Sequence, residues 1–343
     1  MNKVTTFGAL WIITLALIGC GGCGGSSKSG ITGSGSSFVA PMMKKWSSDY
    51  RKARSVDLDY TSAGSGTGVT QMIEKRTDFG CTDAPMNAEQ LDKARQAGGD
   101  VIHVPLVMGG VVPIYNLPDI EHIRFTGPIL ADIFLGKITK WNDPALAKIN
   151  EGVKLPDLPI TVAHRSDTSG TSYIFTDYLT KVSPEWKEKV GTSTEPKWPV
   201  GAGGQKNPGV ALLVADTKGA IGYVELIYAL EDPKLKRGLV QNRAGEFVEA
   251  SLESVTAAAA GLKDVPEDLR FSMTNADGKD SYPISGTVWM VLYVKQDKKA
   301  SELKELIHWL THDGQELAKG LHYARLPKEM VDRVDKKLEL VKP

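Results

Sequence analysis

The sequence has few cysteines and no surplus of either charge. Three of its 343 residues are cysteine and one of these, Cys81, lies beyond the first 30 residues, so disulfide bridges cannot hold the main body together. Its 41 basic residues are balanced by 41 acidic ones, which argues against nucleic acid as the main partner because no broad positive field exists. Its length suits two hydrophobic cores rather than one.

Long hydrophobic runs are also lacking, apart from a short one near the N-terminus. Lys3 precedes the apolar run Phe7–Ile18, whose length is typical of a secretion signal and too short for a convincing membrane span. The run leads into Leu17-Ile18-Gly19-Cys20, which resembles the bacterial lipobox. This resemblance implies cleavage before Cys20 and a lipid on that cysteine. Plain secretion, with cleavage near the same place, remains the alternative.

We therefore expect residues 1–19 to be a signal peptide and 20–30 to be a lipidated cysteine followed by a tether. The tether is rich in glycine and serine, and such a segment has a root-mean-square reach of roughly 15–20 Å. The tether contains Cys23, and the sequence does not decide whether Cys23 and Cys81 form a disulfide. A small buried residue is the interpretation we favour for Cys81.

The most informative stretch is His164–Ser172, which holds one arginine and then hydroxyl residues around a glycine. Apolar residues at helical spacing follow it, so Thr168 or Ser169 is expected to cap a helix. The start of a helix offers free backbone N–H groups and a positive dipole end, both of which favour an anion. The guanidinium of Arg165 adds a forked donor that suits a tetrahedral oxyanion.

Two further segments resemble this one. Thr32–Phe38 precedes a helical stripe with a proline in its first turn, and Ser62–Gly68 precedes another apolar stripe. Three helix starts rich in glycine and hydroxyl groups, together with one arginine, indicate that backbone N–H groups surround a single oxyanion.

The rest of the chain alternates predicted strands with predicted helices, which indicates α/β architecture with sheets covered by helices. Val101–Met108 continues past two glycines, and we interpret residues 109–112 as a crossover between two lobes. Thr287–Val294 is a strongly apolar strand, expected to be the return crossing. The last clear helix is expected to start at Ser301.

Taken together, these segments resemble the phosphate-binding proteins of bacterial phosphate ABC transporters over about residues 30–330. The resemblance is carried by the glycine segments, the Asp83 loop, the Arg165 stretch, and by Leu135–Asp143, Gly219–Glu225 and Tyr282–Ser285. It implies a type II periplasmic binding protein with two lobes, each a mixed and mostly parallel sheet flanked by helices, joined by two crossover strands. Lobe I would comprise residues 31–110 and 285–343, and lobe II residues 111–284.

The resemblance also implies a function and a ligand site. The protein would bind inorganic phosphate between the lobes and pass it to an ABC transporter permease in the inner membrane. It would be a monomer on the periplasmic side of the bacterial envelope, with no cofactor, metal or catalytic residue. Asp83 would accept the ligand's proton, Arg165 would pair with the ligand, and Asp167 would support Arg165. The residues expected to contact phosphate are Ser36, Ser37, Phe38, Ser65, Asp83, Arg165, Ser169, Gly170 and Thr171.

The residues also allow other interpretations. A hydrolase using Ser169, His164 and Asp167 is disfavoured because the chain has no Gly-x-Ser-x-Gly motif and triad members rarely lie so close in sequence. A receptor for sulfate or molybdate, or a phosphate-sensing lipoprotein, stays an alternative. His308 and His312 have the spacing of metal ligands, but Trp309 replaces the glutamate of His-Glu-x-x-His, so we interpret them as exposed histidines.

Overall fold

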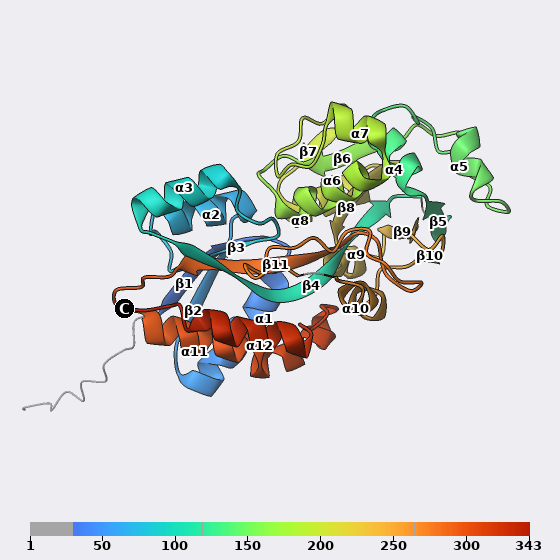
Figure 1. Cartoon of the computed structure of the whole chain (residues 1–343). Helices are drawn as coiled ribbons and strands as arrows, with labels where there is room; N and C mark the ends of the chain where they lie inside the picture. The colour runs from blue at the N-terminus through green and yellow to red at the C-terminus, as the bar shows by residue number, and fades with distance from the viewer. Residues whose placement is uncertain (1–29, 118, 264) are drawn as a thin grey trace, which may run out of the picture.

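The structure is a computed structural model and describes residues 30–117, 119–263 and 265–343 (Figure 1). The predicted signal peptide, Cys20 and Cys23 lie outside the described residues. Across the described ranges, no helix is both long enough and apolar enough to span a membrane. Cys81 is buried, as predicted.

The first lobe begins with strands and helices in alternation. Its elements up to the crossover are β1 (Ile31–Gly35), α1 (Ala40–Arg54), β2 (Leu58–Ser62), α2 (Ser65–Ile73), β3 (Phe79–Thr82), α3 (Ala88–Ala97) and the long strand β4 (Val101–Tyr115). The chain returns to this lobe with β11 (Ser285–Tyr293), α11 (Ala300–Thr311), the 3₁₀ segment η1 (Asp313–Leu321) and α12 (Lys328–Leu338).

The sheet of the first lobe has the strand order β2-β1-β3-β11-β4. The pairs β1–β2 and β1–β3 are parallel, whereas β11 runs antiparallel to both of its neighbours. Helices α2 and α3 lie on one face of this sheet, and α1, α11 and α12 on the other (Figure 1). The three parallel strands therefore end at the same edge, and the loops that follow them meet there.

The second lobe contains the remaining elements. They are β5 (His122–Phe125), α4 (Gly127–Phe134), α5 (Pro144–Lys148), β6 (Thr161–Arg165), α6 (Gly170–Val182), α7 (Pro184–Lys189), β7 (Ala202–Gly204), α8 (Lys206–Asp216), β8 (Ala220–Glu225), α9 (Leu226–Glu231), β9 (Lys236–Gln241), β10 (Phe247–Val248) and α10 (Leu252–Ala260). Strands β7, β6 and β8 are parallel to each other, and β8 pairs antiparallel with β4.

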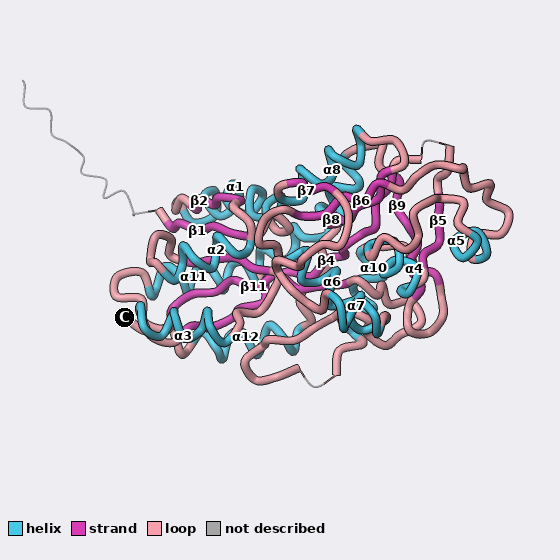
Figure 2. Tube along the Cα trace, turned by 90° about the horizontal axis from the view of Figure 1, so that it is seen from above, coloured by secondary structure: helices cyan, strands magenta, loops and turns pink. Residues whose placement is uncertain are grey.

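Strand β4 joins the two lobes, which lie side by side in both views (Figures 1 and 2). Its residues 101–110 pair with β11, and from Val111 onward it pairs with β8. The predicted crossover at residues 109–112 therefore coincides with the point where β4 changes its neighbour.

The return connection differs from the expectation for Thr287–Val294. All of β11 pairs with residues 101–110 of β4, so this strand lies within the first lobe. The chain returns to the first lobe just before β11, where the N–H of Val111 donates to the carbonyl oxygen of Ile284 at 2.8 Å. Helix α10 also packs against first-lobe residues such as Met108 and Ala324.

Local patterns predicted many elements correctly. The apolar stripe predicted after Thr32–Phe38 forms the buried side of α1 (Met42, Met43, Trp46 and Tyr50). The helix expected from Ser301 is α11, which begins one residue earlier, and a further helix that was not expected, α12, follows it. The buried residues of α12 are Met330, Val334 and Leu338. These apolar side chains, four residues apart among many charges, mark its inner face.

Candidate ligand-binding site between the lobes

The predicted site residues come from loops that follow parallel strands in both lobes. Ser36 follows β1, Ser65 is the first residue of α2 after β2, and Asp83 follows β3. From the second lobe, Arg165 ends β6 and Ser169 caps α6. The carboxyl ends of these strands thus face each other across the boundary between the lobes.

Arg165 is nearly inaccessible, with 2% of its side chain exposed. Its Nε donates to Asp167 Oδ1 at 2.8 Å and its Nη2 to Asp167 Oδ2 at 2.6 Å, which is the paired geometry of a guanidinium and a carboxylate. Burial raises the pKa of Asp167, but the bonds and charge of Arg165 outweigh it and leave that pKa below its usual value. The remaining nitrogen, Nη1, is buried and has no partner within the described residues. Arg165 is therefore fixed on one side and keeps donors for a ligand on the other.

Asp83 is a buried carboxyl group surrounded by hydroxyl groups. Ser36 Oγ donates to its Oδ1, and Thr171 Oγ1, from the other lobe, lies 3.4 Å from its Oδ2. Burial raises the pKa of Asp83 to about 7, although the Ser36 bond and the positive charge of Arg165 act in the opposite direction. This carboxylate thus lies where its charge is poorly solvated and a donated proton would stabilise it.

The N-terminus of α6 lies against Asp83 and Ser65. Ser169 is its N-cap and accepts the N–H of Ser172 at 3.0 Å, which selects Ser169 from the two predicted candidates. A Cβ atom on Gly170 would lie 2.6 Å from Asp83 Cβ and from Ser65 Oγ, so only glycine permits this close approach.

The two lobes also contact each other through the backbone. The N–H of Gly66 donates to the carbonyl oxygen of Thr168 at 3.1 Å. Beside this contact, a pocket of about 200 Å³ is lined by residues of both lobes, among them Ser65 and Tyr173. The structure therefore shows the lobes in a closed arrangement.

Ser37 and Phe38 are held by residues of the second lobe and of the chain's C-terminal part. Tyr228 Oη donates to the Ser37 carbonyl at 2.7 Å, and Tyr323 Oη donates to the Phe38 carbonyl at 2.6 Å. The N–H of Phe38 donates to Ser36 Oγ at 3.0 Å. The loop after β1 is thus fixed on several sides.

Asn207, the second residue of α8, was not predicted. Its Nδ2 donates to Ser37 Oγ at 3.0 Å and to Thr171 Oγ1 at 3.2 Å, and so links predicted ligand residues from the two lobes. Its Oδ1 accepts the N–H of Glu225 at 3.0 Å. The sequence carries no signal for this role, because an asparagine before a proline is typical of an ordinary turn.

Glu225 is a second buried carboxyl group that sequence reasoning missed. Its Oε2 accepts the N–H of Ile227 at 3.1 Å, while its Oε1 is buried without a partner in the described part of the chain. Burial raises the pKa of Glu225 well above its usual range. It stands at the end of β8, next to the crossover in β4.

The residues of the alternative hydrolase are otherwise engaged. The hydroxyl of Ser169 caps α6, and Asp167 binds the guanidinium of Arg165. The ring of His164 stacks on Trp198 with centroids 5.0 Å apart, and its Nδ1 lies 3.0 Å from the carbonyl oxygen of Arg165. These three residues therefore do not form the chain of contacts from nucleophile to base to carboxylate that a hydrolase needs.

Comparison with known proteins shows similarity over most of the chain. The model of the PBP superfamily domain matches residues 24–313. The chain is 44% identical over 311 residues to the phosphate-binding protein PstS of Xylella fastidiosa strain Temecula1, covering 89% of this chain and 84% of that protein. It is 43% identical over 309 residues to the phosphate-binding protein PstS of Pasteurella multocida, covering 89% and 88% of the two chains.

The fold has a solved counterpart in a phosphate-binding protein from Stenotrophomonas maltophilia. The two structures align with a TM-score of 0.70 at 18% sequence identity, covering 90% of this chain and 94% of the other. The expectation of an α/β binding-protein fold is thereby confirmed.

Proposed function

Because this chain belongs to the PstS family of phosphate-binding proteins within the PBP superfamily, we propose that it binds inorganic phosphate between its lobes and delivers it to the permease of a phosphate ABC transporter. It is a binding protein and not an enzyme. One observation in the structure carries this proposal: a buried arginine, one nitrogen of which has no partner among the described residues, and a buried carboxyl group are brought together from opposite lobes.

Phosphate would be held by donors from both lobes and by one acceptor. Arg165 Nη1 would donate to one phosphate oxygen, and the backbone N–H groups of Gly170 and Thr171 would donate from the positive end of α6. Ser36, Ser37, Phe38, Ser65 and Ser169 would complete the shell, with the N–H of Phe38 exchanging its bond to Ser36 Oγ for one to the phosphate. Asp83 would accept the proton of the phosphate ion. In this arrangement residues 31–110 and 285–343 act as one lobe and 111–284 as the other.

Transport can be tested with the permease of the same organism reconstituted in lipid vesicles. We expect ATP-driven uptake of labelled phosphate only when the purified binding protein is added. The same protein carrying Arg165→Lys, which is expected to bind phosphate poorly, serves as the matched control. Uptake that does not depend on the added protein, or that the variant supports equally well, would contradict a role in delivery.

Ligand binding should also change the shape of the protein. Phosphate contacts both lobes only when they are closed, so it should shift the population toward the closed state. Small-angle X-ray scattering should therefore give a smaller radius of gyration with saturating phosphate than without it. Sulfate at the same concentration is the control and should leave the profile unchanged. Identical profiles with and without phosphate would count against closure.

The protein would lie on the periplasmic side of the envelope, anchored through a lipid on Cys20. Each buried CH₂ of an acyl chain contributes about 0.8 kcal/mol to membrane binding, so several chains would hold the protein firmly. We predict that Cys20→Ser moves the protein from the membrane fraction to soluble or uncleaved material. Cys23→Ser, three residues further on, should fractionate like the wild type. The lipid anchor would be excluded if the Cys20 variant fractionated like the wild type and if the mass of the wild type showed no added acyl chains.

A further inference from the structure

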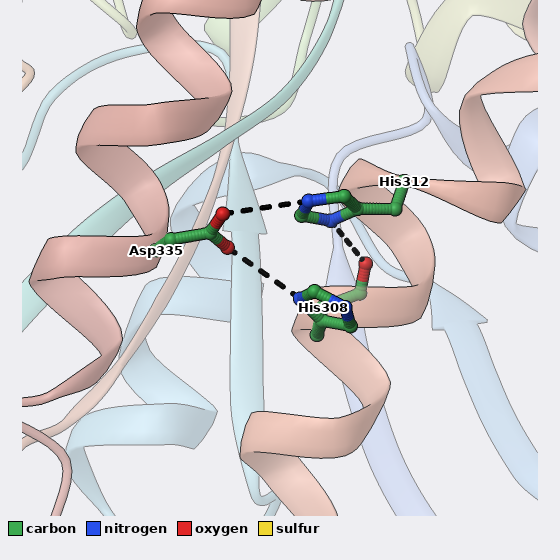
Figure 3. A group of neighbouring side chains, drawn as sticks. All are labelled: His308, His312 and Asp335. Carbon is green, nitrogen blue, oxygen red and sulfur yellow. Dashed lines mark hydrogen bonds and ion pairs between the residues drawn. The ribbon is translucent and has the colours of Figure 1, made fainter.

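Three polar side chains gather on the outer helices of the first lobe, remote in sequence from the site residues. His308 lies in α11, His312 caps the end of α11, and Asp335 projects toward both from α12 (Figure 3). One potential ligand atom from each residue lies within 4.8 Å of those of the other two. His308 is largely exposed, whereas about a third of the His312 side chain is accessible.

The hydrogen bonding of His312 determines which of its nitrogens is free. Its Nδ1 lies 2.9 Å from the carbonyl oxygen of His308, and a carbonyl can only accept, so Nδ1 carries the hydrogen. In the neutral ring Nε2 then presents a lone pair, and it lies 3.4 Å from Asp335 Oδ2. Metal-binding histidines typically have this arrangement, with one ring nitrogen held by a carbonyl and the other facing the ion.

Asp335 faces these rings with an oxygen that lacks a donor. Its Oδ1 is buried and has no hydrogen-bond partner among the described residues, and it lies 3.5 Å from His308 Nδ1. At the contact between His312 Nε2 and Asp335 Oδ2, two lone pairs face each other, which is unfavourable unless a cation or a proton lies between them. Ligand atoms of tetrahedral Zn²⁺, bound at about 2.0–2.1 Å, are separated by about 3.3–3.4 Å. In the structure His308 Nδ1 and His312 Nε2 lie 3.5 and 3.4 Å from different oxygens of Asp335, so one ion would bind both oxygens or turn the carboxylate slightly.

We propose that His308, His312 and Asp335 form a binding site for a divalent metal ion of the Zn²⁺ class, which clamps α12 onto α11. Two imidazoles and one carboxylate are ligands that Zn²⁺ accepts, and water would complete the tetrahedron at this accessible position. The sequence showed the two histidines but not the third ligand, because Asp335 reaches them only through the packing of α12. The bound ion would stabilise the folded protein by mass action.

The test is calorimetric titration of untagged full-length protein with ZnCl₂ in phosphate-free buffer, with thermal unfolding measured in parallel. We expect one Zn²⁺ per chain and a melting temperature that rises with zinc concentration. His312→Ala and the nearly isosteric Asp335→Asn should each weaken zinc binding by at least about tenfold, since even residues that only support metal ligands typically contribute about 10–100-fold. Phosphate affinity, measured without zinc, should stay unchanged in both variants.

His122→Gln is the matched control, because it removes an exposed histidine from β5 in the other lobe. It should bind zinc like the wild type. Absence of zinc binding by the wild type would show that only a proton joins these residues and would overturn the proposal. Equal zinc binding by the wild type and the His312 and Asp335 variants would overturn it as well, since the zinc would then be bound elsewhere.

Discussion

Replacing Arg165 with lysine should weaken phosphate binding by well over tenfold. Lysine keeps the positive charge but cannot bind Asp167 through two nitrogens while presenting a third to the ligand, as Arg165 does. The substitution would also leave Asp167 short of a partner in a mostly buried position. Breaking a buried, hydrogen-bonded charge pair typically costs about 2–5 kcal/mol, and each 1.4 kcal/mol is about a tenfold change in affinity.

Isothermal titration with phosphate measures this effect directly. Arg243→Lys is the control, because Arg243 lies in the same lobe but is exposed and paired with Asp277 at the surface. That variant should bind phosphate as the wild type does. An Arg165→Lys affinity within twofold of the wild type, with both variants folded by circular dichroism, would remove Arg165 from the binding site.

Replacing Asp83 with asparagine should make the ligand-free protein less sensitive to rising pH. The pKa of Asp83 is raised from 3.8 to about 7 by burial, so between these values the folded state binds more protons at this position than the unfolded state. Stability contributed by the protonated form is present below pH 4 and is lost as the pH approaches 7. In the closed arrangement, where Asp83 is buried, this shift lowers the unfolding free energy of the wild type by about 4 kcal/mol across that interval; opening of the ligand-free lobes reduces the loss because it solvates Asp83.

Chemical denaturation at pH 5 and pH 8 without phosphate tests this expectation. The stability of Asp83→Asn relative to the wild type should be greater at pH 8 than at pH 5 by up to about 2–3 kcal/mol, the part of the loss that falls above pH 5. Asp59→Asn provides a control, because Asp59 is an exposed residue of β2 in the same lobe. A stability difference between Asp83→Asn and the wild type that stays the same at both pH values would show that Asp83 is ionised at pH 5 already and is solvated in the ligand-free protein.

The sequence predicted those parts of the site that depend on local signals. The cap at Ser169 and the helix starts after the glycine segments involve residues only a few positions apart, so short-range patterns could reveal them. The pairing of Arg165 with Asp167 was implied by the family resemblance. The position of Asp83 between Ser36 and Thr171 required the family resemblance, because the three residues come from different strand ends.

The parts that sequence reasoning missed depend on contacts between distant segments. Asn207 gains its role only because α8 places it beside both Ser37 and Thr171, which are 170 and 36 residues away along the chain. Tertiary packing likewise places Glu225 beside the crossover and brings Asp335 to the histidines of α11. In each case an ordinary polar residue acquires a partner that no local spacing could indicate.

The central claim is that Asp83 selects phosphate by accepting its proton. An ionised carboxylate can only accept, so it bonds to a protonated phosphate but faces a lone pair of fully ionised sulfate. Competitive titration of phosphate and sulfate on the wild type and on Asp83→Asn, at one pH and salt concentration, tests this most directly. We predict that the wild type strongly prefers phosphate, and that the variant narrows the gap mainly by gaining sulfate affinity. An unchanged ratio of phosphate to sulfate affinity in the variant would contradict the claim.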